Sequence, residues 1–206
     1  MTTFEMIAFD IETTGFEVGD RLTVVGFEFP MASRVFVNTD GRDVTDLQER
    51  ASEATGHRVV VSMHDDEEAL LNAVGEFGLE RFTEDGLMLV AYNGEKWKSG
   101  FDLPFLRTRL ARSDAEWPFR DLPYADLMPV IERRFNTTVG EDDDRRAVND
   151  LVGAYDTLIG GDASQIDPFV DSAEAVEAFE NGEFVDLVAH NVADIRRTRE
   201  LGRLAQ

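Results

Sequence analysis

The chain has 206 residues, 43% of them hydrophobic, and its 42 acidic and 20 basic side chains give a net charge of −22. This length and composition favour one packed domain over residues 1–206 and exclude global disorder. The absence of cysteine excludes disulfides, thiolate metal sites and a cysteine nucleophile, and the lack of a long apolar run or a secretion signal predicts a cytoplasmic protein without a membrane span.

The first predicted strand, residues 4–12, places two carboxylates on one face. Asp10 and Glu12 alternate with apolar residues, and side chains two apart in a strand point the same way. Two carboxylates this close repel each other, so a divalent cation is the natural neutraliser. The alternative is an edge strand with a solvated acidic face. Thr13-Thr14-Gly15 ends the strand, and Gly15 permits a tight turn or the close approach of a ligand.

Further elements are predicted from alternation, apolar runs and breaker residues. Strands over 22–29 and 33–38 follow after short turns and should form an antiparallel meander with the first strand. A short piece of strand is expected at 59–61, and the apolar run 87–92 predicts a central strand. The predicted helices begin at Asp65 and Asp102 and span 126–135, 147–158, 172–181 and 183–204, with a polar loop over 140–146.

Two more acidic positions lie where functional residues are common. Asp102 begins a helix that follows a buried strand. His190 and Asp194 are four residues apart in the last helix, so their side chains lie on one face. Each has a structural alternative, namely a helix N-cap for Asp102, an ion pair with Arg197 for Asp194, and a packed helix histidine for His190.

Three motifs resemble, in order, those of the DEDD (DnaQ-like) 3′–5′ exonucleases of the ribonuclease H-like superfamily. They are Asp-Ile-Glu-Thr-Thr-Gly at 10–15, Asn-Gly followed by Gly-Phe-Asp-Leu-Pro-Phe-Leu within 93–106, and His-Asn-x-x-Asp at 190–194. The resemblance implies an α/β fold with a ribonuclease H-like mixed five-stranded sheet, its first three strands antiparallel, flanked by helices.

The same resemblance implies a metal-dependent exonuclease that hydrolyses phosphodiester bonds at single-stranded DNA or RNA 3′ ends. Asp10, Glu12, Asp102 and Asp194 would hold two divalent metal ions, Mg²⁺ or Mn²⁺, which suit carboxylate oxygens. Glu12 would also help to activate the attacking water, and His190 would accept its proton. DNA replication or repair proteins are candidate partners, while DNA or RNA substrate and oligomeric state are left open.

The third motif departs from the family pattern. One branch of the family has Tyr with three residues between it and the last Asp, and the other has His with four residues between. Here His190 is followed by three residues before Asp194, as in family-B polymerase proofreading domains and their stand-alone archaeal relatives, which carry Tyr. The identity of the base is therefore open. Two alternatives to an exonuclease are open. One is a non-catalytic or weakly active nucleic-acid-binding module on the same fold, and the other is a purely structural acidic domain.

Several residues beside these motifs are candidates for substrate binding. Thr13, Thr14 and Gly15 follow the first carboxylates, and Asn93 and Phe101 flank the second motif, although Phe101 would equally suit core packing. Trp97 lies between Lys96 and Lys98, so that a base could stack on the indole while the lysines contact phosphates. The alternative is a surface loop with one packed tryptophan.

The charge pattern predicts adaptation to high salt. Acidic residues are spread along the whole chain, and only Lys96 and Lys98 are lysine, the other basic residues being Arg. This acid-rich, lysine-poor composition resembles that of proteins from salt-loving archaea, in which strong negative charge maintains solubility. A nucleic-acid mimic is the alternative, although a mimic needs no buried carboxylate pair. Because nucleic acid is itself anionic, positive charge should gather locally at the site.

Overall fold

The computed structural model describes residues 4–83, 86–95, 101–171 and 173–206. Within these residues, six strands form one sheet in the order β4-β3-β2-β1-β5-β6, and two short strands form a second, separate pair. The strands of the main sheet are β1 (Glu5–Thr13), β2 (Leu22–Glu28), β3 (Ser33–Asn38), β4 (Val59–His64), β5 (Leu87–Ala91) and β6 (Tyr124–Asp126). The chain is therefore an α/β protein with a mixed sheet, as expected.

The first three strands form the predicted antiparallel meander, with β1 paired to β2 and β2 paired to β3. The remaining strands are parallel to their neighbours: β4 to β3, β5 to β1 and β6 to β5. The expectation of five strands is wrong, since the described part of the chain builds six into this sheet. Residues 59–64, expected only as a short piece of strand, pair along their whole length with β3.

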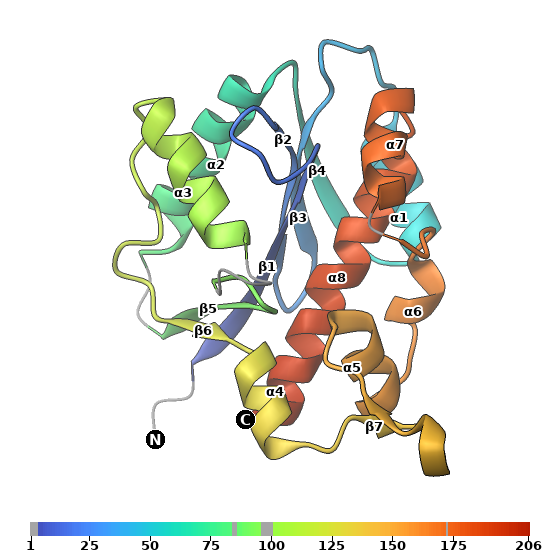
Figure 1. Cartoon of the computed structure of the whole chain (residues 1–206). Coiled ribbons are helices and arrows are strands. Elements are labelled where there is room, and N and C mark those ends of the chain that lie inside the picture. The colour runs from blue at the N-terminus through green and yellow to red at the C-terminus, as the bar shows by residue number, and fades with distance from the viewer. Residues whose placement is uncertain (1–3, 84–85, 96–100, 172) are drawn as a thin grey trace.

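Helices cover both faces of the sheet (Figure 1). One face carries α2 (Glu67–Arg81) and α3 (Asp102–Arg112), and the other carries α1 (Leu47–Thr55), α7 (Ala173–Asn181) and α8 (Phe184–Ala205). The smaller elements are α4 (Met128–Arg134), the strand pair β7 (Thr138–Val139) and β8 (Arg146–Ala147), the 3₁₀ turn η1 (Asp142–Asp144), α5 (Leu151–Leu158) and α6 (Ala163–Ile166). Among the described residues, no helix is long and apolar enough to cross a bilayer.

The alternation of β1 divides the hydrophobic core into two layers. Ile7, Phe9 and Ile11 face α2 and α3, in a cluster rich in phenylalanine. The opposite side of β1 carries Ala8, which packs under α8, and then the two carboxylates that the sequence predicts. The polar side of β1 thus faces the long helix that carries the third motif.

Several helix boundaries follow from local chemistry. Asp66 caps α2 by accepting a hydrogen bond from the Ala69 amide at 2.8 Å, which matches the acidic start predicted there. The helix predicted over 147–158 begins only at Leu151, because Asp150 caps it through the Gly153 amide. The sequence prediction missed α1, α6, β6 and the strand pair β7–β8, which are short and depend on packing for stability.

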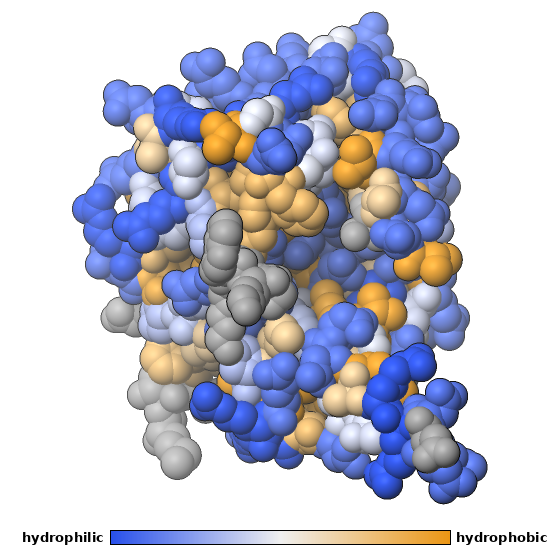
Figure 2. Space-filling model, in the orientation of Figure 1, coloured by the Kyte–Doolittle hydropathy of each residue, from blue (hydrophilic) through white to orange (hydrophobic). Residues whose placement is uncertain are grey.

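Most of the face shown in Figure 2 is hydrophilic, with smaller apolar areas between the polar side chains. A hydrophilic face agrees with a net charge of −22 spread along the chain.

Candidate functional site

Two segments far apart in sequence meet on the α8 side of β1, and a third lies near them. Asp10 and Glu12 come from β1, and α8 contributes His190 and Asp194. The His190 Nε2 atom lies 3.9 Å from both Glu12 Oε1 and Asp194 Oδ2. One ligand atom from each of these three residues lies within 4.8 Å of the others. Asp102, the first residue of α3, lies close enough for its charge to raise the pKa of Asp10.

The four carboxyl groups disfavour each other's ionisation. Burial, and then the charges of Glu12, Asp102 and Asp194, raise the pKa of Asp10 well above its usual range. Burial raises the pKa of Glu12 to about 7 even though the charge of His190 opposes the shift. Burial also raises the pKa values of Asp102 and Asp194. The charge of His190 opposes the shift at Glu12 and Asp194, and that of Arg197 opposes it at Asp194, yet these pKa values remain raised. A divalent cation would supply the further positive charge that the cluster needs.

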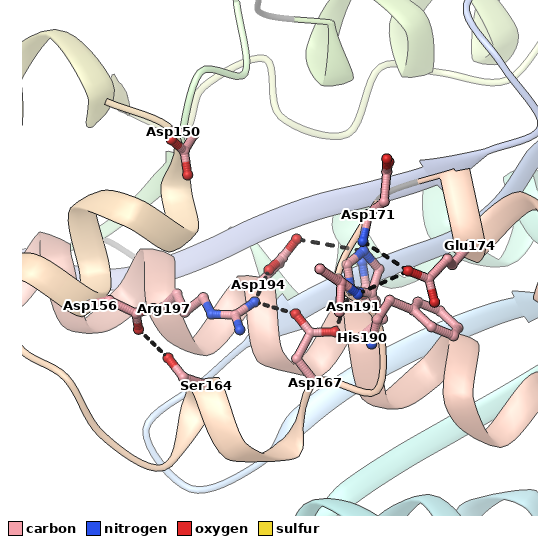
Figure 3. Close-up of polar contacts among 12 residues, drawn as sticks. Asp150, Asp156, Ser164, Asp167, Asp171, Glu174, His190, Asn191, Asp194 and Arg197 are labelled. Atoms are coloured by element: carbon pink, nitrogen blue, oxygen red, sulfur yellow. Dashed lines mark hydrogen bonds and ion pairs between the residues drawn. The ribbon is translucent and has the colours of Figure 1, made fainter. Parts of the chain in front are cut away.

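His190 is held from its other side by a residue that the sequence prediction missed. Asp167, in the segment between α6 and α7, contacts His190 Nδ1 through Oδ1 at 2.8 Å (Figure 3). Burial alone would lower the pKa of His190, but the charge of Glu12, the hydrogen bond to Asp167 and the charge of Asp194 raise it to about 9. Nothing in the spacing of residue 167 identifies it in advance, because only the tertiary structure brings this segment over α8.

Arg197 joins the same network from one turn further along α8. Its side chain is 2% exposed, and its Nη1 donates to Asp167 Oδ2 at 2.5 Å and to Asp194 Oδ1 at 2.6 Å (Figure 3). The ion pair considered as the alternative role for Asp194 is therefore present. Arg197 contacts only Oδ1 of Asp194, because Oδ2 of Asp194 faces His190.

Asn191 fastens α8 to the carboxylates of β1. Its Nδ2 donates to Asp10 Oδ2 at 3.0 Å and lies 3.5 Å from Glu12 Oε1. The side chain is completely buried, and its Oδ1 finds no hydrogen-bond partner among the residues that the structure describes. Gly26, opposite Asp10 in the β1–β2 register, makes room for this amide, because a Cβ at Gly26 would lie 1.9 Å from Asn191 Oδ1. A glycine inside a strand is the one sequence signal that could have indicated this close approach.

Gly26→Ala should therefore displace Asn191 and disturb the carboxylates. We expect the free energy of unfolding to fall by about 1–3 kcal/mol, the usual cost of overpacking, and Mn²⁺ to bind more weakly. Urea denaturation and titration calorimetry with Mn²⁺ measure the two effects. Gly19→Ala is the matched control, because a Cβ there meets nothing within 4 Å. Equal stability and Mn²⁺ affinity in both variants would contradict the packing role of Gly26.

Gly15 lies in a tight turn after β1, as predicted. The Thr13 hydroxyl donates to the Gly15 carbonyl at 2.8 Å, and the Thr14 hydroxyl contacts Asp20. Gly15 has φ 155°, and a Cβ there would lie 2.5 Å from an Asp20 carboxylate oxygen. Phe16, which the sequence analysis did not select, is 80% exposed at this turn.

The second motif lies at the carboxyl ends of β5 and β6. Asn93 adopts a left-handed conformation with φ 62°, and its amide donates to Asp126 Oδ1 at 2.9 Å. Asp102 is not the N-cap considered as its alternative role, because Phe101 occupies that position. The Phe101 ring packs against Phe105 and, edge-on, against exposed Phe16. Phe101 thus belongs both to the core and to the surface at the site.

Asp126 was also missed by the sequence prediction. Its charge helps to raise the pKa of Asp102 after burial and the charge of Glu12. Its Oδ1 accepts from the amides of Asn93 and Met128, so its first role is to shape the turn after β5. Lys96, Trp97 and Lys98, predicted to contact substrate, lie outside the described residues.

Arg109 and Arg112 of α3 lie against the turn after β1. Arg109 pairs with Glu67, and both arginines donate to the Val18 carbonyl. The two arginine side chains therefore connect α3 to the turn after β1 by hydrogen bonds.

Comparison of the chain with protein-family models and with curated proteins finds no match.

Proposed function

We propose that the protein is a metal-dependent 3′–5′ exonuclease that hydrolyses phosphodiester bonds at single-stranded DNA or RNA 3′ ends. The observation that carries the proposal is the set of four partly buried carboxyl groups with raised pKa values, Asp10, Glu12, Asp102 and Asp194, drawn from β1, α3 and α8. The order of the three motifs and a sheet that begins with an antiparallel meander and continues with parallel strands support a ribonuclease H-like fold of the DEDD type.

The residues present fit divalent metal ions. Mg²⁺ and Mn²⁺ prefer carboxylate oxygens, and the pKa of each of the four carboxyl groups is raised, as expected where a neutralising cation belongs. Asp10, Glu12, Asp102 and Asp194 would hold them. Bound there, such ions would polarise the scissile phosphate and promote ionisation of the attacking water.

The remaining side chains have roles that follow from their positions. His190 would accept a proton at Nε2, the ring nitrogen that faces Glu12 and Asp194. The charge of Glu12 contributes to the raised pKa of His190, so neutralising the carboxylates would lower that pKa from about 9 towards the range useful to a base. The exposed ring of Phe16, edge-on to Phe101, offers a surface for a terminal base.

A second candidate function is a nucleic-acid-binding module with little or no activity. Two contacts favour it: Asn191 engages an oxygen of Asp10, and Arg197 engages an oxygen of Asp194. Oxygens held in this way are less available to a metal ion. The three-residue spacing of His190 points in the same direction.

Incubation of the protein with 5′-labelled single-stranded DNA and RNA oligonucleotides separates the two functions. We expect progressive shortening from the 3′ end with Mg²⁺ or Mn²⁺, and none with a chelator, because the carboxylates alone cannot activate water. A range of salt concentrations shows how far binding depends on phosphate contacts. Retention of an intact oligonucleotide by the metal-loaded protein would instead favour the binding module.

A further inference from the structure

The segment between α6 and α7 determines how the His190 imidazole lies in the site. This segment is not part of any of the three motifs, yet its Asp167 side chain is only 5% exposed and contacts the ring directly. Phe169 of the same segment packs against the ring with centroids 5.2 Å apart. The imidazole is therefore enclosed by a carboxylate and a phenyl ring from outside α8 (Figure 3 shows the carboxylate).

The Asp167 carboxylate is itself held by three donors. Oδ1 accepts from the Phe169 amide at 3.1 Å as well as contacting His190 Nδ1, and Oδ2 accepts from the buried Arg197 guanidinium. A carboxylate with both oxygens engaged in this way has little freedom to turn. Because Arg197 also contacts Asp194, the orientation of the imidazole is tied to that of a carboxylate in the cluster.

The two ring nitrogens consequently have different surroundings. A carboxylate at Nδ1 favours the tautomer with its proton there, so that the lone pair of the neutral ring lies on Nε2. That atom is 3.9 Å from Glu12 Oε1 and from Asp194 Oδ2, beyond hydrogen-bond distance, so neither carboxylate engages its lone pair directly. Among the described residues, Asp167 supplies the hydrogen bond to Nδ1.

We propose that Asp167 is a positioning residue that holds His190 with Nδ1–H on its carboxylate and Nε2 towards Glu12 and Asp194. The proposal rests on the exonuclease function above, and it explains how a histidine at three-residue spacing serves as the base. The helix places His190 and Asp194 on one face, and Asp167 supplies the orientation that this spacing alone does not determine.

Asp167→Asn is the discriminating substitution. The amide keeps one acceptor oxygen and replaces the other by a donor, so it cannot serve both Arg197 and His190 Nδ1–H. If the oxygen faces Arg197, the amide NH₂ faces Nδ1 and favours the tautomer with its proton on Nε2. We expect kcat to fall roughly 10- to 100-fold with little change in KM. Asp167→Glu, which keeps both acceptors, should recover part of the loss.

A double-mutant cycle separates positioning from a general structural role. In the His190→Gln background, Asp167→Asn should change kcat by less than about threefold, because there is no longer an imidazole to orient. Mn²⁺ affinity by calorimetry should stay within about threefold of wild type in Asp167→Asn. Asp162→Asn is the control, since this exposed residue nearby makes no side-chain cap bond. Equal losses of kcat in both backgrounds would overturn the proposal.

Ring ¹⁵N NMR of the Mg²⁺-loaded protein tests the same point without activity. The protein has three histidines, so the His190 signals are identified by their loss in His190→Gln. We expect the proton on Nδ1 in wild type and in Asp167→Glu, and on Nε2 in Asp167→Asn. A wild-type ring with its proton on Nε2 would overturn the positioning role, as would an unchanged tautomer in Asp167→Asn. A wild type that hydrolyses no oligonucleotide would instead overturn the proposed function, while the NMR result still decides the positioning.

Discussion

Replacing Asp10 by Asn should reduce metal-dependent hydrolysis by about 10³-fold while the fold survives. The change is isosteric, and an amide oxygen at residue 10 can still accept the hydrogen bond from Asn191 Nδ2. What is lost is negative charge at the centre of the carboxylate cluster. Because burial and neighbouring charges disfavour the ionised form of Asp10, the metal-free variant should also unfold at a higher temperature than wild type. Single-turnover hydrolysis and thermal melting in a chelator measure the two effects.

Asp194→Asn should cause a loss of similar size, and the matched control lies on the same helix. Asp186 is an exposed carboxylate of α8, so Asp186→Asn removes the same charge from the helix without touching the cluster. It should leave hydrolysis unchanged. Full activity of Asp10→Asn with Mg²⁺ would contradict the assignment of the carboxylates as metal ligands.

Removal of divalent metal should make the protein less stable, increasingly so as pH rises. Without metal, Glu12 has its pKa raised from 4.5 to about 7, so between these values the folded state binds more protons than the unfolded state, and stability falls with rising pH. His190, with its pKa raised from 6.5 to about 9, contributes stability below 6.5 that is lost as pH rises through 9. The Glu12 shift therefore weakens the metal-free fold between pH 4.5 and about 7, and the His190 shift continues the trend from 6.5 to about 9.

Mg²⁺ should oppose this trend, because its binding requires ionised carboxylates and therefore strengthens as pH rises. At a concentration of 100 times Kd it adds about 2.7 kcal/mol, or roughly 5–10 °C in Tm for a chain of this size. Thermal melts at several pH values, with Mg²⁺ or with a chelator, measure the difference.

The general acidity of the surface also destabilises the protein as pH rises, so a control is needed. Glu49→Gln combined with Glu53→Gln neutralises two exposed carboxylates of α1 and should leave the effect of Mg²⁺ on Tm intact. Asp10→Asn combined with Glu12→Gln should remove most of it. An equal response to Mg²⁺ in the two double variants would show that the ion acts on the surface as a whole.

Strong local signals made much of the fold predictable. The alternation in β1, the short turns of the meander and the apolar run at 87–92 each specify a local geometry without help from distant residues. Prediction failed where an element depends on partners far along the chain. The full length of β4 is stabilised by parallel pairing with β3, and the three-residue β6 by pairing with β5.

The sequence by itself determined which carboxylate and imidazole side chains share a face at the candidate site. Spacing placed Asp10 and Glu12 on one face of a strand, and His190 and Asp194 on one face of a helix, because periodicity within an element is a property of the backbone. Only the tertiary structure decided what surrounds them. The Asp167 carboxylate on the imidazole, the Arg197 bridge and the fit of Asn191 over Gly26 join elements that no local pattern relates. Contacts of that kind depend on how helices pack on the sheet, and no periodicity in the chain encodes them.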